Sequence, residues 1–142
     1  MAAMKVVLDD ARLLAIPHSL RDKADEVCGS TAKAIEGKMK MAIMDTRKTG
    51  RIYRFGKVIH QASAPGESPA TDTGNLVNSI NSEKVRQMLH RVNVHAEYGP
   101  YLEYGTSRMA PRPFLNPAFE DEREAFKRRV DKLIAAARSS TR

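Results

Sequence analysis

The feature that most constrains the fold is a segment rich in aromatic residues and proline at residues 98–119. It holds four of the chain's seven prolines, which fix the path of the backbone. Its aromatic rings can bury a large area at low entropic cost. We therefore expect the segment to be ordered but irregular. It offers few acids, bases or nucleophiles that could converge, so it favours contact with another protein over catalysis.

A long helix is predicted over residues 18–46, because apolar side chains recur there every three or four positions. Ser19 is its expected N-cap. Two glycines inside it, Gly29 and Gly37, predict close packing or a slight bend, since glycine weakens a helix by about 1 kcal/mol. Residues 1–17 are expected to form an N-terminal arm or a short helix.

A second long helix is predicted over residues 116–138. Asn116 can cap its start, and Pro117 suits the first helical position. Acidic side chains near the start and basic ones near the end complement the helix dipole. The expected buried stripe consists of Phe119, Phe126, Val130, Leu133 and Ile134.

Residues 51–96 are predicted to form a sheet region. β-Branched and aromatic residues indicate a strand over 51–60 that folds back near Gly56. A loop rich in Pro, Gly and Ser follows at residues 61–73. Next come a short helix over 74–80, which Asp72 or Thr73 can cap, and two strands over 81–96.

This order of elements predicts a single α+β domain over residues 1–142, with the aromatic and proline-rich segment at 97–115. The long N-terminal and C-terminal helices are expected to pack on one face of a small antiparallel β-sheet, with a short helix in the middle.

The net charge of +7 favours polyanionic partners, although no nucleic-acid-binding motif accompanies it. Five basic residues fall within eleven positions: Arg47, Lys48, Arg51, Arg54 and Lys57. One interpretation is a patch that faces phosphate or a DNA channel. The other is a charged sheet edge that discourages aggregation, and the lack of a base-recognition motif favours it.

The sequence carries no recognisable catalytic or metal-binding pattern. The single cysteine, Cys28, excludes an intrachain disulfide and is expected to be a small buried hydrophobe. His60, Glu67 and Asp72 are near each other in sequence, but the loop gives no reason for them to converge. We therefore predict no catalytic residue, no metal and no cofactor. No apolar run is long enough to span a membrane, which predicts a chain made in a cytoplasm.

Two sequence blocks resemble the small neck or tail-completion proteins of long-tailed bacteriophages and prophages, often labelled minor tail components. The first is Pro-Ala-Thr-Asp-Thr-Gly-Asn-Leu-Val-Asn-Ser-Ile at residues 69–80. The second joins Tyr-Gly-Pro-Tyr-Leu-Glu-Tyr-Gly-Thr at 98–106 to Arg-Pro-Phe-Leu-Asn-Pro-Ala at 112–118. Both occur in the order seen in that family. One departure is Gly99, where many members carry alanine.

The resemblance implies a non-enzymatic virion protein, made in the bacterial cytoplasm and built into a ring at the head–tail joint, around the DNA channel. Its partners would be further copies and neighbouring head-closure, tail-terminator or tail-tube rings. Residues of the types enriched at protein interfaces are Tyr98, Tyr101, Glu103, Tyr104, Arg108, Met109, Arg112 and Phe114.

Several alternatives stay open for these residues. Tyr101, Leu102 and Phe114 could instead close the core under the C-terminal helix, and this interpretation is favoured for Leu102 and Phe114. Glu103 could pair locally with Arg108 or Arg112. The main alternative function is a basic protein that binds nucleic acid without sequence preference.

Overall fold

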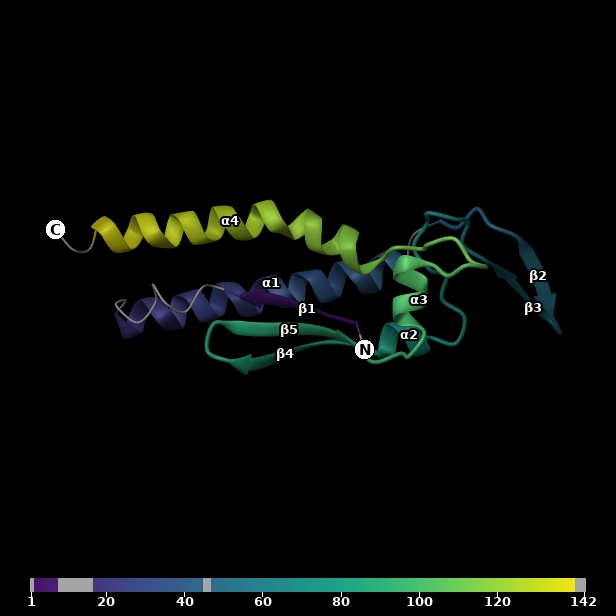
Figure 1. Cartoon of the computed structure of the whole chain (residues 1–142), viewed down its shortest axis with the longest axis horizontal. Coiled ribbons are helices and arrows are strands. Elements are labelled where there is room, and N and C mark those ends of the chain that lie inside the picture. Colours follow the sequence, from purple (N-terminus) through teal and green to yellow (C-terminus); the bar gives the residue numbers. More distant parts are fainter. Residues whose placement is uncertain (1, 8–16, 45–46, 140–142) are drawn as a thin grey trace.

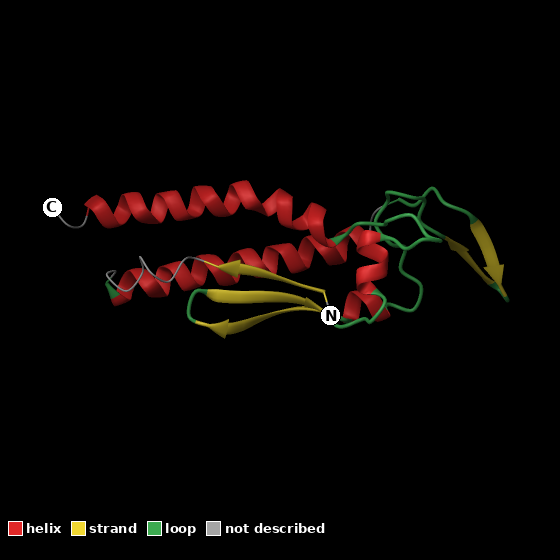
Figure 2. Cartoon of the chain, in the orientation of Figure 1, coloured by secondary structure: helices red, strands yellow, loops and turns green. Residues whose placement is uncertain are grey.

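The structure, a computed structural model, describes residues 2–7, 17–44 and 47–139. It confirms an α+β fold (Figure 2). Most of the predicted N-terminal arm, residues 8–16, lies outside the described residues. The elements are β1 (Ala2–Val7), α1 (His18–Met44), β2 (Ile52–Phe55), β3 (Val58–Gln61), α2 (Asn75–Asn78), β4 (Ile80–Arg86), β5 (Leu89–Val94), α3 (Gly99–Tyr104) and α4 (Leu115–Ser139).

Helix α1 lies at the centre of the molecule (Figure 1). On one side it packs against an antiparallel sheet with the strand order β1-β5-β4. On its other side it packs against α4, which runs in the opposite direction. Both long helices therefore lie on the same side of the sheet, as predicted, and α1 separates α4 from the strands.

The core forms where one stripe of α1 meets the sheet and the start of α4. The α1 side chains in it recur every three or four positions, which is why a helix can present them together. Val92 and Val94 of β5 pack against this stripe, and Ile80, which pairs with Val94, opens β4. The fully enclosed α1 members are Cys28, Ala32, Ile35, Met39 and Ile43. The interpretation of Cys28 as a buried hydrophobe is confirmed, and burial raises the pKa of its thiol to about 11.

The two glycines of α1 differ in their surroundings. A Cβ at Gly29 would lie 3.0 Å from Cε1 of His90, so the helix and β5 approach closely there. A Cβ at Gly37 would meet nothing within 4 Å. Close packing is therefore confirmed at Gly29, and Gly37 has no close neighbour of this kind.

Helix ends differ from the predictions for local reasons. Helix α1 begins at His18, before Ser19, and the amides of Leu20 and Arg21 donate to the carbonyl of Pro17. Helix α2 is only one turn long and follows Gly74, whose φ of 76° is left-handed, and no side chain caps it. Neither Asp72 nor Thr73 is thus the cap.

The predicted buried stripe of α4 is only partly correct. Leu115 and Ala118 at its start are buried, but Phe126 is only partly covered. Farther along, Ile134 is 44% exposed. The described residues therefore enclose α4 at its beginning and leave its second half as a more open surface.

Strands β2 and β3 form a separate two-stranded sheet that extends from one end of the molecule (Figure 1). This hairpin, residues 51–61, is called the arm below. It turns at Gly56, which has a φ of 63°, so the predicted fold-back is confirmed. The arm pairs with neither the three-stranded sheet nor a second hairpin within the described part of the chain.

Candidate assembly surface at the arm end

The two sequence blocks meet at the end of the molecule that carries the arm. The first forms the loop before α2 and α2 itself, and the second forms α3 and its connection to α4 (Figure 1). Together with the arm they line an open pocket of about 410 Å³. Its walls include Tyr53 of the arm, Leu76 of α2, Tyr98 just before α3, Leu102 of α3, and Arg112. This end, with its pocket, is the candidate site.

Helix α3 corrects the prediction that residues 97–115 are irregular. It spans Gly99–Tyr104 with proline in its first turn, a position that proline tolerates well. A Cβ at Gly99 would lie 2.8 Å from Cγ1 of Val94, so alanine would force a shift there. The helix ends at Tyr104, and the next residue, Gly105, has a left-handed φ of 74°. The chain reverses there, so that the backbones of Thr106 and Met109 pair.

Glu103 has a different role from the two predicted for it. It is 3% exposed, so it does not lie on the surface, and it pairs with neither Arg108 nor Arg112. Its carboxylate accepts the backbone N–H groups of Phe114, Leu115 and Asn116 at 2.8–2.9 Å. These are amides at the start of α4 that have no partner within the helix. Glu103 therefore caps α4, the role that the sequence assigned to Asn116.

Phe114 and Arg112 also hold this end together from inside. Phe114 is 2% exposed and belongs to the core, so only the alternative interpretation of this residue fits the structure. Arg112 is half-buried, donates from Nη1 to Oγ of Ser63 at 3.0 Å, and donates its backbone N–H to Leu102. Arg112 thus fastens the second block to the loop that follows the arm.

The tyrosines are the residues that remain on the surface. Tyr98, Tyr101 and Tyr104 follow each other at spacings of three, so they lie along one side of α3. With Tyr53 of the arm they are all four tyrosines of the chain, and each is 44–65% exposed. These four residues are called the tyrosine surface. Arg108 is exposed near them, and Met109 is half-buried.

Of the five residues in the predicted basic cluster, one lysine has a structural role and the other four are exposed. Lys48 donates from Nζ to the carbonyls of Ala42 and Ser68 and to the Ser68 hydroxyl, at 2.8–3.0 Å. Burial lowers its pKa. Lys48 therefore closes the end of α1 and does not face phosphate. The side chains that stay exposed are Arg47, Arg51, Arg54 and Lys57.

Glu67 fastens the base of the arm from the other side. Its carboxylate accepts the Thr49 hydroxyl, the Thr49 amide at 3.0 Å and the Ala64 amide at 2.8 Å. The hydrogen bonds from Thr49 and Ala64 lower the pKa of Glu67 to about 2. A Cβ at the neighbouring Gly50 would lie 2.5 Å from the carbonyl oxygen of Ala62, so the two ends of the arm touch. These contacts hold the two ends of the arm together at its base.

A contact that the sequence did not suggest joins His60 to Asp72. Their side chains lie 3.1 Å apart, and the His60 ring stacks on Tyr53 with centroids 5.9 Å apart. The expectation that these loop residues do not converge is thus wrong for this pair, whereas Glu67 lies with Thr49. The described residues hold no group of three or more His, Cys, Asp or Glu side chains that could bind a metal. The pair orders the arm against the loop.

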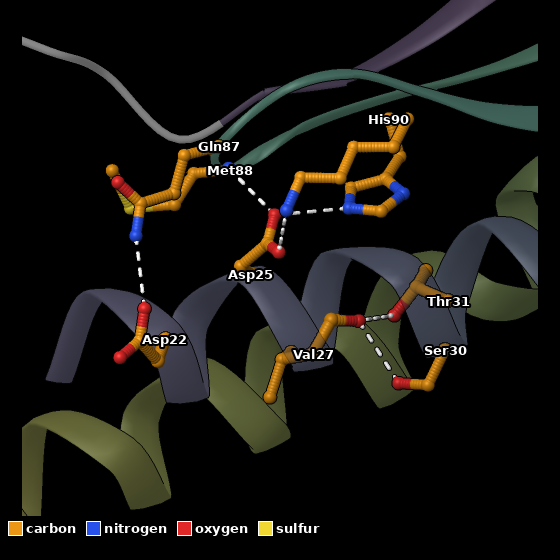
Figure 3. Close-up of polar contacts among 9 residues, drawn as sticks. Asp22, Asp25, Val27, Ser30, Thr31, Gln87, Met88 and His90 are labelled. Carbon is orange, nitrogen blue, oxygen red and sulfur yellow. Dashed lines mark hydrogen bonds and ion pairs between the residues drawn. The ribbon is translucent and has the colours of Figure 1, made fainter. Parts of the chain in front are cut away.

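A second polar cluster lies far from the arm, between α1 and the β4–β5 turn (Figure 3). Asp25 accepts hydrogen bonds from Lys84, from the amide of Met88 and from Nε2 of His90. Burial raises the pKa of Asp25, but these hydrogen bonds outweigh it and lower the pKa to about 2.

This cluster holds the β4–β5 turn against α1. The two hydroxyls of α1 drawn beside the cluster, those of Ser30 and Thr31, both donate to the Val27 carbonyl and not to His90 (Figure 3). Met88 is not glycine but has a left-handed φ of 60°. The hydrogen bond from its backbone amide to the Asp25 carboxylate holds that conformation. Asp25 and Met88 are 63 residues apart, so no local pattern could have revealed the contact.

Comparisons with protein-family models, curated proteins and solved structures found no match to this chain. Among the described residues, no helix combines the length and the apolar character needed to cross a membrane.

Proposed function

We propose that the chain is a structural virion protein of a tailed phage, one subunit of an oligomeric ring at the head–tail joint around the DNA channel. The observation that carries the proposal is that every tyrosine of the chain is exposed, and that all four belong to the arm end. The resemblance of both sequence blocks to neck and tail-completion proteins supplies the class of assembly.

The tyrosine surface has the properties of a protein interface. Tyrosine combines a large apolar ring with a polar tip and loses little rotamer entropy when it is covered. The backbone beneath these rings is held by Glu103 and by the turn at Gly105. A surface held rigid before association loses less entropy when it binds, which strengthens the contact.

The arm offers a second, different surface for assembly. Ile52, Val58 and Ile59 are 55–63% exposed, an unusual environment for β-branched apolar side chains. A hairpin of two strands is only marginally stable alone in water, and its strand edges carry unpaired backbone groups. A ring needs two unlike patches that meet head to tail, which the tyrosines beside and within α3 and the exposed apolar residues of the arm can provide.

The proposed role is non-enzymatic. The polar side chains around Asp25 and in the His60–Asp72 pair make hydrogen bonds and contacts that give them a structural role. The partners would be further copies of the chain and the adjoining head-closure, tail-terminator or tail-tube rings. The location would be the virion, after synthesis in the bacterial cytoplasm.

The test is self-association of the purified protein, measured by native mass spectrometry. The wild type is expected to form a closed oligomer at micromolar concentration. Replacing Tyr101 and Tyr104 by serine should weaken association at least about tenfold, because interface tyrosines commonly contribute more than about 1 kcal/mol each. The thermal midpoint should stay close to that of the wild type, since both rings are exposed.

A matched control replaces Val85 and Ile134 by serine. Both are 44% exposed and belong to β4 and α4, away from the tyrosine surface. This control should associate like the wild type. A wild-type protein that stays monomeric, or a control that loses association as strongly as the tyrosine variant, would contradict the proposal.

A further inference from the structure

We propose that the arm is a β-ribbon that binds the phosphate backbone of double-stranded DNA without sequence preference. The inference concerns a nucleic-acid contact and does not depend on the proposed ring. It rests on the charge, the shape and the attachment of the arm.

The arm and the residues just before it carry only positive charge. Residues 47–61 contain five Lys and Arg side chains and no Asp or Glu. Lys48 is engaged in closing α1, but the side chains of the other four are exposed. In the described structure none of the four makes an ion pair or a side-chain hydrogen bond. These four residues, Arg47, Arg51, Arg54 and Lys57, are called the free cations.

The nearest carboxylates do not neutralise the free cations. Glu67 is occupied by Thr49 and Ala64, and Asp72 contacts His60. Elsewhere in the molecule cations do meet carboxylates, as Lys38 meets Glu122 at 3.1 Å. The arm therefore presents positive charge that a polyanion can use, and each phosphate contact releases condensed counterions from DNA.

The shape of the arm fits a DNA groove. It is a two-stranded ribbon that extends away from the body of the molecule (Figure 1). The DNA major groove is about 12 Å wide and admits such a ribbon. An acidic protein surface would match the charge but would not call for a projecting ribbon.

The base of the arm is already ordered for such binding. Lys48 and Glu67 fix both sides of it, and Gly50 packs directly on the backbone of Ala62. The free cations thus project from a fixed frame, so fewer backbone degrees of freedom are lost on binding. Contacts to phosphate position a protein without reading bases, which is why we infer binding without sequence preference.

The experiment is fluorescence anisotropy with a labelled duplex of random sequence, over salt concentrations from about 50 to 250 mM. The wild type should bind with a log–log salt slope of about −3 to −4, since each neutralised phosphate contributes about −0.9. Replacing Arg51, Arg54 and Lys57 by glutamine should weaken binding at low salt by about tenfold or more and make the slope shallower by about 2 to 3.

The control replaces Lys127, Arg128 and Lys132 by glutamine, which removes the same charge from exposed positions on α4. Its affinity should stay within about threefold of the wild type, with an unchanged slope. A control that weakens as much as the arm variant would show an effect of net charge alone and overturn the proposal. Absence of wild-type binding at low salt would also overturn it.

Polyglutamate serves as a competitor to separate DNA from acidic protein. Duplex DNA is expected to displace the labelled probe at far lower charge concentration than polyglutamate. Equal displacement per charge would indicate that the arm takes any polyanion, including an acidic protein, and would overturn the assignment to DNA. Circular dichroism of both glutamine variants must match the wild type, which exposed positions allow.

Discussion

Glu103 orders the junction between α3 and α4 through a single buried carboxylate. Its two oxygens accept the amides of Phe114, Leu115 and Asn116, where the helix dipole is positive. A buried charge is tolerated only where hydrogen bonds replace the lost water, and three such bonds do so here. The tyrosines on the outer side of α3 depend on this junction for their position.

Replacing Glu103 by glutamine tests this role. Glutamine keeps the shape but removes the charge and turns one acceptor into an NH₂ group that faces donors. We expect the free energy of unfolding to fall by about 2–3 kcal/mol in urea titrations. The matched control, Glu97→Gln, changes an exposed residue and should stay within about 0.5 kcal/mol of the wild type. Equal stability of the two variants would show that Glu103 is not the cap.

The hydrogen-bond partners of Glu103 and Lys48 could not be predicted from the local sequence. A carboxylate inside a short helix looks like a surface residue, and its partners follow 11 to 13 positions later, in a different element. Lys48 stands in a basic run, and its contact with Ser68 spans 20 positions. Only the folded chain shows which charged residues are engaged and which are free.

The β4–β5 hairpin and α1 are joined by Asp25 at the turn and by Glu36 along the strand. Glu36 accepts the amide and the hydroxyl of Ser82 at 2.7–2.8 Å. Burial raises the pKa of Glu36, but the hydrogen bonds from Lys40 and Ser82 lower it overall. The two carboxylates thus hold the sheet on α1 in one register, together with the apolar core.

The low pKa of Asp25 predicts how this contact depends on pH. Its pKa in the folded state is about 2, below the ordinary 3.8 of the unfolded chain. The carboxylate therefore stabilises the fold fully above about pH 4, and this contribution is lost as the pH falls towards 2. Asp25→Asn should cost about 1–2 kcal/mol near neutral pH, a range that allows for its partial solvent exposure.

Urea titrations of wild type and Asp25→Asn at neutral pH and near pH 3 measure this effect. The stability difference between the two proteins should be smaller at the lower pH. The control is Asp22→Asn, which changes an exposed residue that accepts a hydrogen bond from Gln87. Its stability difference from the wild type should change little with pH. A difference for Asp25→Asn that stays constant with pH would contradict the role given to its carboxylate.

Periodicity predicted the elements well where a long stripe was available. Helix α1 follows from its recurring apolar residues, and the arm follows from its β-branched residues and Gly56. Periodicity failed in short elements, because α3 contains proline and glycine that suggest irregular chain. It also overstated the burial of α4, since an apolar stripe does not say how much of it a neighbour covers.

The whole molecule is elongated, and its two ends differ (Figure 1). The helices and the three-stranded sheet share the apolar core, while the other end carries the arm, the pocket and the tyrosine surface. The sequence concentrates proline and aromatic residues in the segment that forms part of this end. The sequence favoured a buried Phe114, as found, but it could not separate buried Glu103 from exposed Tyr101 and Tyr104, since that distinction depends on which side of α3 faces the core.

The most direct test of the central claim is site-specific photo-cross-linking in assembled phage particles. A photoreactive phenylalanine analogue is placed at Tyr104, on the tyrosine surface, or at Ile134, on the open part of α4. The assembly role predicts cross-links from position 104 to a second copy or to an adjoining virion protein, and few from position 134. Particles that lack the chain, or a position 104 that captures no partner, would contradict it.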